Sequence, residues 1–270
     1  MDTDNAEGPV IGADDLRAGL RRLGVREGET VLVHASLSRF GVVDGGAGAV
    51  ADALLSAVGP AGTVLAPAFT FSNGRAERPF LDLLGSPSEM GAVPEELRHR
   101  AGPHRSAHLT HSVAAVGAGA AAFTAGHSVT PCGQASAFWK LIERSGSVVL
   151  LGVSLNSMTL FHAIEEHLRL PYIRFRDLAG ECCGVDGVTR PLLSQCHNSL
   201  RRYDFNPQAA VLEQAGVLRA EVIGRAVCRR IAAQRLWEFL RPRLEGDPYL
   251  LTLAGEERVQ IPVTVDGKLA

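Results

Sequence analysis

The class of fold is decided by residues 30–67, TVLVHASLSRFGVVDGGAGAVADALLSAVGPAGTVLAP. The stretch begins with a short apolar run at 30–33 and passes through a Ser- and Gly-rich loop. A segment with helical spacing follows at 49–58, and a turn that contains Gly and Pro leads to a second apolar run at 63–67. A strand, a helix and another strand in this order form a βαβ unit, in which the two strands pair in parallel. The sequence therefore predicts an α/β fold.

Patterns elsewhere extend this unit. Apolar runs predict further strands at 112–117 and 148–151, and alternating residues around an Asp-Gly turn predict a β-hairpin over 171–193. Residues 71–91 form a long connection with Pro and Gly, which we expect on the substrate side of the domain. Helical spacing predicts helices at 14–23, 93–100, 137–143, 200–216 and 224–244, with a weak one at 118–129.

The composition limits the classes of protein. The chain has 270 residues, of which 46% are hydrophobic and 21% are charged, and its net charge is −2. This allows one large core and offers no basic, aromatic-interleaved surface for nucleic acid. No apolar run approaches the roughly 20 residues of a membrane span, and the acidic first residues do not resemble a signal peptide. We expect a soluble cytoplasmic protein, with a flexible tail at 1–10 and one domain at 11–270.

Metal and disulfide sites are not expected. The five cysteines are odd in number and lack Cys-x-x-Cys spacing, which argues against a disulfide framework and a structural zinc site. His108 and His111 are conceivable metal ligands, but no third ligand is close to them in the sequence.

A histidine and a carboxylate follow the apolar run at 148–151. Gly152 closes that run, and His162 and Glu165 then stand three residues apart where a helix is expected. Residues at this spacing share one face of a helix. A strand end that presents an imidazole and a carboxylate on one surface suits acid–base chemistry. A surface salt bridge on an ordinary helix is the alternative.

Two polar loops lie beside predicted strands. The loop at 34–41 contains two serines, whose hydroxyls and neighbouring N–H groups suit an anion such as a pyrophosphate. The alternative is a loop that only caps the next helix. The segment 105–113 places an arginine, two serines and two histidines before a strand, and we expect it to face an anion. The sequence contains neither a Walker loop nor a Gly-x-Gly-x-x-Gly motif after a strand.

A hydrolase is the other enzyme class that these residues allow. The segment GVSLN at 152–156 lacks the second glycine of Gly-x-Ser-x-Gly, which weakens that interpretation without removing it. The segment CHN at 196–198 contains the residue types of a thiol-protease site. Adjacent residues rarely point together, however, and such groups normally converge from distant segments.

Four blocks of the sequence, taken in order, resemble the aminoglycoside 3-N-acetyltransferase family, whose members acetylate antibiotics and do not have the GNAT fold. The likeness spans about residues 12–250 and includes weaker blocks at 204–205 and 223–226. Each block alone is weak, whereas the ordered set is specific. The four blocks are VLVHASL at 31–37, RSAHLTHSVAAVG at 105–117, SAFWKL at 136–141, and the segment 149–165, which ends in TLFHAIE.

The resemblance implies a single three-layer α/β/α domain of the antibiotic acetyltransferase type, with a mixed, mostly parallel sheet. It also implies acetyl-CoA as the co-substrate and no metal. We expect substrate contacts from Phe71, Phe138 and Asn198. The residues that we expect to bind CoA come from the two polar loops: His34, Ala35, Ser36, Leu37, Ser38, Arg105, Ser106, His108, Ser112 and Val113.

The family's catalytic histidine maps to His162 and its glutamate to Glu165. A neutral imidazole, with an ordinary pKa of about 6.5, can accept the proton that a primary ammonium must lose before it attacks a thioester. A carboxylate partner orients the ring and stabilises its cation. Because a thioester needs no covalent enzyme intermediate, the expected mechanism is direct transfer in a ternary complex.

The chain departs from the family pattern in three places. Leu109 stands where proline is usual, and SLNSM at 154–158 replaces the usual Gly-His-Asp-Ser-Asn turn. Aminoglycoside-modifying members carry acidic residues in the strand that maps near 194–198, where this chain has SQCHN and no carboxylate. Because polycationic sugars need negative sites, we expect poor aminoglycoside acetylation, with His197 in place of the missing acidic partner of His162.

The sequence thus predicts an acetyl-CoA-dependent N-acetyltransferase. Its acceptor is a primary amine of an aminoglycoside or of another small polar natural product. We expect a monomer or a homodimer without nucleic-acid or membrane partners. A Ser/Cys–His hydrolase or thioesterase and a non-catalytic CoA-binding paralogue are the alternatives.

Overall fold

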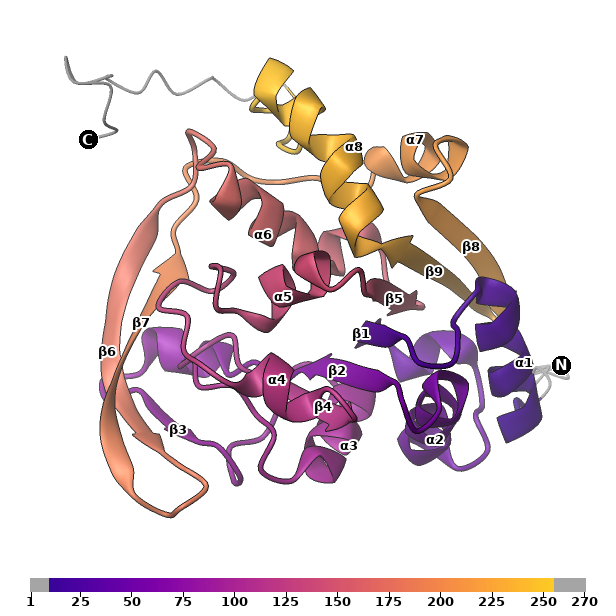
Figure 1. The fold of residues 1–270 in the computed structure, drawn as a ribbon, viewed down its shortest axis with the longest axis horizontal. Coiled ribbons are helices and arrows are strands. Elements are labelled where there is room, and N and C mark those ends of the chain that lie inside the picture. Colours follow the sequence, from indigo (N-terminus) through magenta and orange to yellow (C-terminus); the bar gives the residue numbers. More distant parts are fainter. Residues whose placement is uncertain (1–9, 255–270) are drawn as a thin grey trace, which may run out of the picture.

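The parallel strands expected from the sequence lie at the centre of a six-stranded sheet (Figure 1). The computed structural model describes residues 10–254. Strand β1 (Thr30–Ala35) pairs in parallel with β2 (Thr63–Pro67) on one side and with β5 (Ser147–Leu151) on the other. Helix α2 (Gly46–Val58) lies between β1 and β2 in the chain, which confirms the predicted βαβ unit.

The outer strands of this sheet are antiparallel. Strand β4 (Val113–Gly117) pairs with β2, and β9 (Ala226–Ala232) pairs both with β5 and with β8 (Leu218–Ile223). The strand order is β4-β2-β1-β5-β9-β8. The sheet is therefore mixed, as expected. It is parallel only among its three central strands, however, because both edges are built from antiparallel neighbours, so the expectation of a mostly parallel sheet needs this correction.

Alternate residues of the central strands bury on opposite faces of the sheet, and this produces the three expected layers. Val31 and Val33 belong to one hydrophobic cluster, whereas Leu32 belongs to the other. Figure 1 shows the main helices of the two clusters on opposite sides of the sheet. The cluster with Val31 and Val33 includes residues of α1 (Ala13–Leu23), α2 and α3 (Ala92–Ala101). The cluster with Leu32 includes residues of α4 (Ala120–Thr124), α5 (Ala137–Glu143), α6 (Leu160–His167), α7 (Gln208–Gln214) and α8 (Ala233–Gly246).

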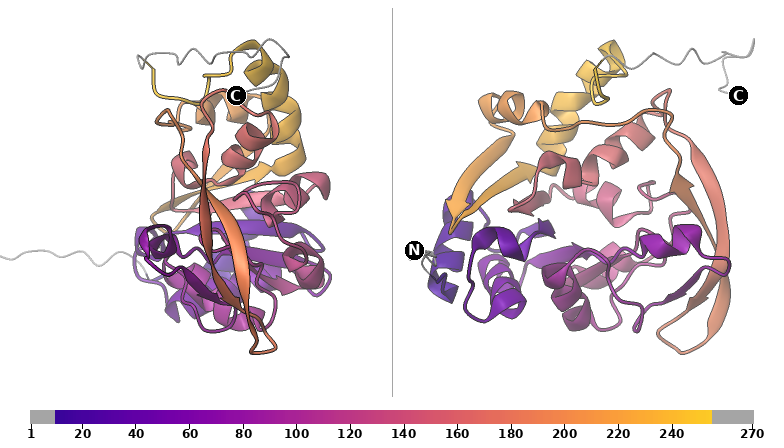
Figure 2. Two further views of the ribbon diagram at one scale, coloured as in Figure 1. Left: turned by 90° about the vertical axis from the view of Figure 1, so that its left-hand side faces the viewer. Right: turned by 180° about the vertical axis from the view of Figure 1, so that it is seen from behind.

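A second, three-stranded sheet stands at the side of the body that is far from α1 (Figures 1 and 2). Its strands β6 (Phe175–Cys183) and β7 (Thr189–His197) form the hairpin that the Asp-Gly turn predicted. The third strand, β3 (Phe80–Asp82), comes from the long connection and pairs in parallel with β6. The connection also contains a 3-10 helix, η2 (Phe71–Arg75). The long connection, expected as a substrate-side loop, thus contains regular structure, and one of its strands pairs with the hairpin.

Two of the predicted helices are wrong in part. Within 200–216 only α7 is helical, and the predicted helix at 224–244 is divided into strand β9 and helix α8. The arginines between 225 and 235 resemble the polar face of a helix. In the structure, the backbone of 226–232 instead pairs with β5 and β8, and Cys228 and Ile231 are buried. Pairing with strands distant in the sequence overrode the local preference.

Other expectations concern cysteines and membranes. All five cysteines are free thiols, as their spacing predicted. Over the described range 10–254, none of the helices has both the length and the apolar character that a bilayer crossing needs. The tail expected at 1–10 falls outside the described residues except for Val10.

Gly180 in β6 lies close against the long connection. A Cβ atom at this position would lie 2.3 Å from the Pro79 carbonyl oxygen and 3.0 Å from Leu109 Cδ1. We expect Gly180→Ala to lower the free energy of unfolding by about 1–3 kcal/mol, the usual cost of overpacking. Urea unfolding measures the effect.

Gly246→Ala is the matched control. Nothing lies within 4 Å of a Cβ atom built there, at the last residue of α8, so a change within about 0.5 kcal/mol is expected. Equal stability of the two variants would show that β6 tolerates a side chain at position 180 and would contradict the tight contact.

Candidate active site

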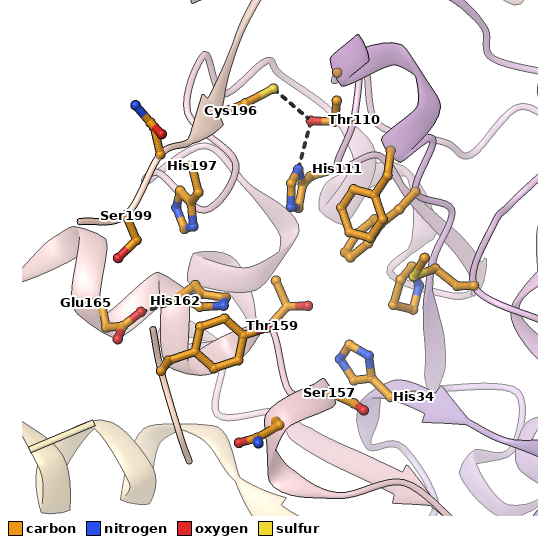
Figure 3. Close-up of a pocket in the computed structure, with 18 of the residues that line it drawn as sticks. His34, Thr110, His111, Ser157, Thr159, His162, Glu165, Cys196, His197 and Ser199 are labelled. Carbon is orange, nitrogen blue, oxygen red and sulfur yellow. Dashed lines mark hydrogen bonds and ion pairs between the residues drawn. The ribbon is translucent and has the colours of Figure 1, made fainter. Parts of the chain in front are cut away.

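The predicted pair of His162 and Glu165 lies on α6, the first α-helix after β5. The chain leaves β5 through Gly152, whose φ of 70° is in the left-handed region, and passes through the 3-10 helix η3 (Leu155–Ser157). His162 Nδ1 lies 2.6 Å from Glu165 Oε2. A ring whose Nδ1–H donates to the carboxylate carries its lone pair on Nε2. The pairing therefore leaves a basic nitrogen for the space that His162 faces (Figure 3).

Glu165 is held from both sides. Its side chain is 1% exposed, and its second oxygen, Oε1, accepts a hydrogen bond of 2.7 Å from the Tyr172 hydroxyl. Burial, together with the neighbouring Glu165 carboxylate, raises the pKa of Tyr172, so this hydroxyl stays protonated and can only donate to Glu165. Two hydrogen bonds thus connect Tyr172 to Glu165 and Glu165 to His162. A surface salt bridge, the alternative considered from the sequence, does not describe a carboxylate that is this deeply buried.

Four histidines line a cavity of about 1180 Å³ in front of this pair (Figure 3). His34 comes from β1, His111 from the loop before β4, His162 from α6 and His197 from the end of β7. The ring centroids of His162 and His197 are 5.1 Å apart, and those of His111 and His197 are 6.3 Å apart. Two residues expected to be catalytic, His162 and His197, are thus brought together from helix α6 and from the end of β7.

Two of these histidines are kept neutral by burial. His34 is 7% exposed, and burial lowers its pKa to about 4. Burial also lowers the pKa of His111 well below its usual value, and the neighbouring His108, His197 and His162 add to this effect. Among the described residues, His34 Nε2 has no hydrogen-bond partner. Its ring lies at the cavity wall in Figure 3, although this nitrogen itself is buried.

A second cavity of about 530 Å³ adjoins the first. Val153 and Ser157 line both cavities, so the two spaces are neighbours. Three arginines, Arg39, Arg225 and Arg229, line the second cavity. Such a concentration of positive charge, next to a strand end and a 3-10 helix, suits a molecule with several phosphates.

The first loop expected to bind CoA is divided between these cavities. His34 and Ala35 line the large cavity, and Ser36 lines the second. Leu37, in the 3-10 helix η1 (Leu37–Phe40), packs against the core instead. Ser38 is exposed, with its hydroxyl 3.4 Å from that of Ser36.

The 105–113 segment was expected to face an anion. In the structure, only its residues Thr110 and His111 line the large cavity. Arg105 is 3% exposed, and its guanidinium donates to the Ser112 hydroxyl and to the carbonyls of Ser86 and Ala68. A cation that is buried in this way supports the fold. We therefore assign neither Arg105 nor Ser112 to CoA.

The remaining residues of this segment also serve the loop itself. His108 Nδ1 accepts hydrogen bonds from the N–H groups of Thr110 and His111, at 3.1 and 2.9 Å. The Ser106 hydroxyl accepts one from the N–H of Val113, at 2.9 Å. His108 is therefore engaged within its own turn. Ser106, His108 and Val113 lie around a separate space of only about 10 Å³, which is too small for a pantetheine chain.

The three residues expected to contact the acceptor have different surroundings. Phe71, which is 45% exposed, and Asn198 line the large cavity. Phe138 is 1% exposed and lies in the hydrophobic cluster around α5, because it faces the sheet from that helix. Of the three, only Phe71 and Asn198 can reach an acceptor.

One group of side chains has the donor types of a metal site. One ligand atom each from Cys132, Glu166 and His197 lie within 4.8 Å of one another. Burial raises the pKa of Cys132 well above its usual value, which opposes the thiolate that a metal requires. The Glu166 carboxylate already accepts hydrogen bonds from the Thr130 hydroxyl and the Cys132 N–H. We assign no metal to this group.

The sequence did not reveal two parts of the site. Tyr172 follows Glu165 by seven residues, and it reaches the carboxylate only because the chain turns back after α6 at Arg169, whose φ is 51°. No local pattern predicts this return. The arginines at 225 and 229 were visible, but the helix predicted there would have placed them on a solvent face.

Comparisons with known proteins indicate the family that the chain is similar to. A family model described as aminoglycoside 3-N-acetyltransferase matches residues 32–245. Aminoglycoside N(3)-acetyltransferase VII of Streptomyces paromomycinus is 37% identical over 190 residues, which cover 64% of this chain and 66% of that enzyme, slightly less than two thirds of its length. Aminoglycoside N(3)-acetyltransferase III of Serratia marcescens is 31% identical over 253 residues, which cover 84% of this chain and 94% of that enzyme.

Solved structures give the same result. The aminoglycoside acetyltransferase AAC(3)-Xa superposes with a TM-score of 0.78 at 31% identity, over 88% of this chain and 93% of that chain. The binary complex of AAC-IIIb with CoASH superposes with a TM-score of 0.77 at 27% identity, over 88% of this chain and 97% of that chain.

The Arg105 contacts predict a structural role that can be separated from CoA binding. Arg105→Met removes the donor from two carbonyls and one hydroxyl, so we expect it to lower the free energy of unfolding by at least about 2 kcal/mol. CoA affinity of the folded protein should stay unchanged, as measured by calorimetry at low temperature.

Arg21→Met, on the exposed end of α1, is the control and should change neither the free energy of unfolding nor the CoA affinity. Normal stability of Arg105→Met with loss of CoA binding would restore the expectation drawn from the sequence.

Proposed function

The chain belongs to the aminoglycoside 3-N-acetyltransferase family, and we propose that it transfers the acetyl group of acetyl-CoA directly to a primary amine, with His162 as the general base. The observation that carries this proposal is the hydrogen bond between His162 Nδ1 and the buried Glu165, which leaves Nε2 toward the cavity. The cavity is wide enough for an acceptor and the acyl end of the co-substrate to meet there.

The reaction follows from these positions. The nitrogen of the amine forms a bond to the carbonyl carbon of the thioester, and Nε2 of His162 takes the proton that the amine loses. The carbon–sulfur bond then breaks, and the CoA sulfur leaves with the proton that His162 has carried. Glu165 stabilises the imidazolium between these steps, and the Tyr172 hydroxyl keeps that carboxylate in place. His34 and His111, which burial keeps neutral, add no positive charge to the wall around the amine.

The two neighbouring cavities suggest a path for acetyl-CoA. Its phosphates fit the second cavity, beside Arg39, Arg225 and Arg229. The pantetheine arm then passes Val153 and Ser157 into the large cavity, where the thioester meets the acceptor. The His34 ring, at the wall of the large cavity, can donate a hydrogen bond to an amide or thioester oxygen of that arm. A neutral ring is suited to this role because it offers one donor without placing a charge beside the amine.

A hydrolase receives less support from the geometry. Cys196, the nucleophile that would lie beside His197, has its thiol directed to the Thr110 hydroxyl at 3.8 Å (Figure 3). Thiol release from acetyl-CoA in the absence of any amine would nevertheless identify a thioesterase. Tight CoA binding without turnover would identify a non-catalytic paralogue.

His162 is tested by substitution. We expect His162→Ala to lower kcat by about 100-fold or more, the usual contribution of a general base, because no other group takes the proton from the amine. The affinity for acetyl-CoA should be retained. Amine-dependent thiol release measures the rate. His99→Ala, at an exposed position on α3, is the control, and near-normal turnover of His162→Ala would remove His162 from the mechanism.

The route of the co-substrate predicts a difference between acetyl-CoA and S-acetylpantetheine, which lacks the nucleotide and its phosphates. Arg225→Ala and Arg229→Ala should each weaken acetyl-CoA binding by about tenfold, which corresponds to about 1.4 kcal/mol. The preference for acetyl-CoA over S-acetylpantetheine should fall by the same factor. Arg235→Ala, on the exposed side of α8, is the control. An undiminished preference in both cavity variants would place the phosphates elsewhere.

A further inference from the structure

The large cavity offers no carboxylate to an ammonium group of an acceptor. Among the described residues that line it, Glu165 is the only acidic one. Both of its oxygens are engaged, Oε2 with His162 and Oε1 with Tyr172. Glu166 is near His197 but is bound to Thr130 and to the Cys132 N–H, outside the lining of this cavity.

Two exposed arginines stand in the same lining. Arg75 ends η2 and Arg176 lies near the start of β6. Arg176 Nη2 donates to the carbonyl of Gly74 at 2.8 Å, which places its guanidinium beside the backbone that leads into Arg75. Neither guanidinium forms an ion pair with a carboxylate among residues 10–254. Two adjacent cations without counter-charges form a site for an oxyanion.

The phosphates of CoA have a different place in this molecule. They fit the second cavity, whose three arginines come from η1, from the β8–β9 turn and from β9. Arg75 and Arg176 come from the long connection and the hairpin, and neither lines the second cavity. Arg201 and Arg202 also line the large cavity. Both make other contacts, such as that of Arg201 with the Tyr249 ring, and neither is counted with Arg75 and Arg176.

We propose that the acceptor is an amine that carries an oxyanion, a carboxylate or a phosphate, on the same small molecule. Arg75 and Arg176 bind the oxyanion and thereby direct the amine to His162. A polycationic sugar meets the reverse situation, since it brings several ammonium groups to a wall that contains Arg75 and Arg176 and, among the described residues, no carboxylate except the engaged Glu165. The inference rests on the proposed acetyl transfer and names the class of its acceptor.

Amines that share the same carbon chain and differ in the charge of their second group test the charge preference of the site. The set is γ-aminobutyrate, the corresponding amino alcohol, the phosphate ester of that alcohol, and the diamine putrescine, with an aminoglycoside added. We expect kcat/KM for the better of the two anionic acceptors to exceed that of the amino alcohol by about tenfold or more, the effect of one charged hydrogen bond. The diamine and the aminoglycoside should rank below the alcohol. The carboxylate and phosphate arms show which oxyanion the site prefers.

Charge-removing variants assign the preference to residues. Arg75→Gln and Arg176→Gln should bring the ratio between the anionic acceptor and the amino alcohol close to one, and the loss should fall on KM for the anionic acceptor rather than on KM for acetyl-CoA. Arg78→Gln is the matched control, because Arg78 lies three residues further along the same connection and outside the cavity lining; its ratio should stay as in the parent. A rise in KM for acetyl-CoA in the two variants would overturn the proposal, because the arginines would then serve CoA.

Calorimetric binding of the same acceptors to the enzyme–CoA complex separates the two proposals. A ranking by charge that depends on Arg75 and Arg176 supports the acceptor class even without turnover, in which case only the acetyl transfer fails. Amine-dependent acetylation with no preference for anions, or with preference for the aminoglycoside, overturns the acceptor class and leaves acetyl transfer in place.

Discussion

The burial of the Glu165 carboxylate is the constraint on which the site depends. A carboxylate that is 1% exposed is tolerated only where each oxygen has a donor. Tyr172 and His162 supply these donors, and each is placed by a different part of the chain. Residues on the buried face of α6, such as Phe161 and Ile164, anchor the helix in the core. The orientation of His162 is therefore set by packing that extends well beyond the site.

The central part of the molecule could be predicted from the sequence because its signals are local. The apolar runs at 30–33, 63–67 and 148–151 are buried strands whose partners are also apolar runs, and the helix between the first two follows its spacing. His162 and Glu165 were found because a spacing of three residues on a helix brings two side chains to one face. The ordered blocks of family resemblance gave the fold and the reaction class.

The parts that escaped prediction depend on long-range contacts. The strand at 226–232 pairs with β5 on one side and with the strand at 218–223 on the other, and its arginines mimic a helical pattern. Arg105 looked like an anion-binding residue, yet its guanidinium serves the carbonyls of Ala68 and Ser86, which lie far from it in the sequence. Phe138 is similar, since a helix position alone does not show whether an aromatic ring faces a core or a cavity. Whether Arg105 and Phe138 are buried depends on how the sheet and the helices pack together, which the local sequence does not show.

The two sheets contribute different things to the cavity. The six-stranded sheet and its helices hold His34, Glu165 and His162, whereas Phe71, Arg75, Arg176 and His197 belong to the small sheet and its connection. The small sheet is attached as a unit, because Asn73 donates to the carbonyls of Phe80 and Leu109, and β3 pairs with β6. Mutational drift on this unit can alter which molecules are recognised while the proton-transfer residues stay under separate selection. Relatives that share the reaction are thus free to diverge in the molecules that they modify, and the hairpin is the region where that divergence should accumulate fastest.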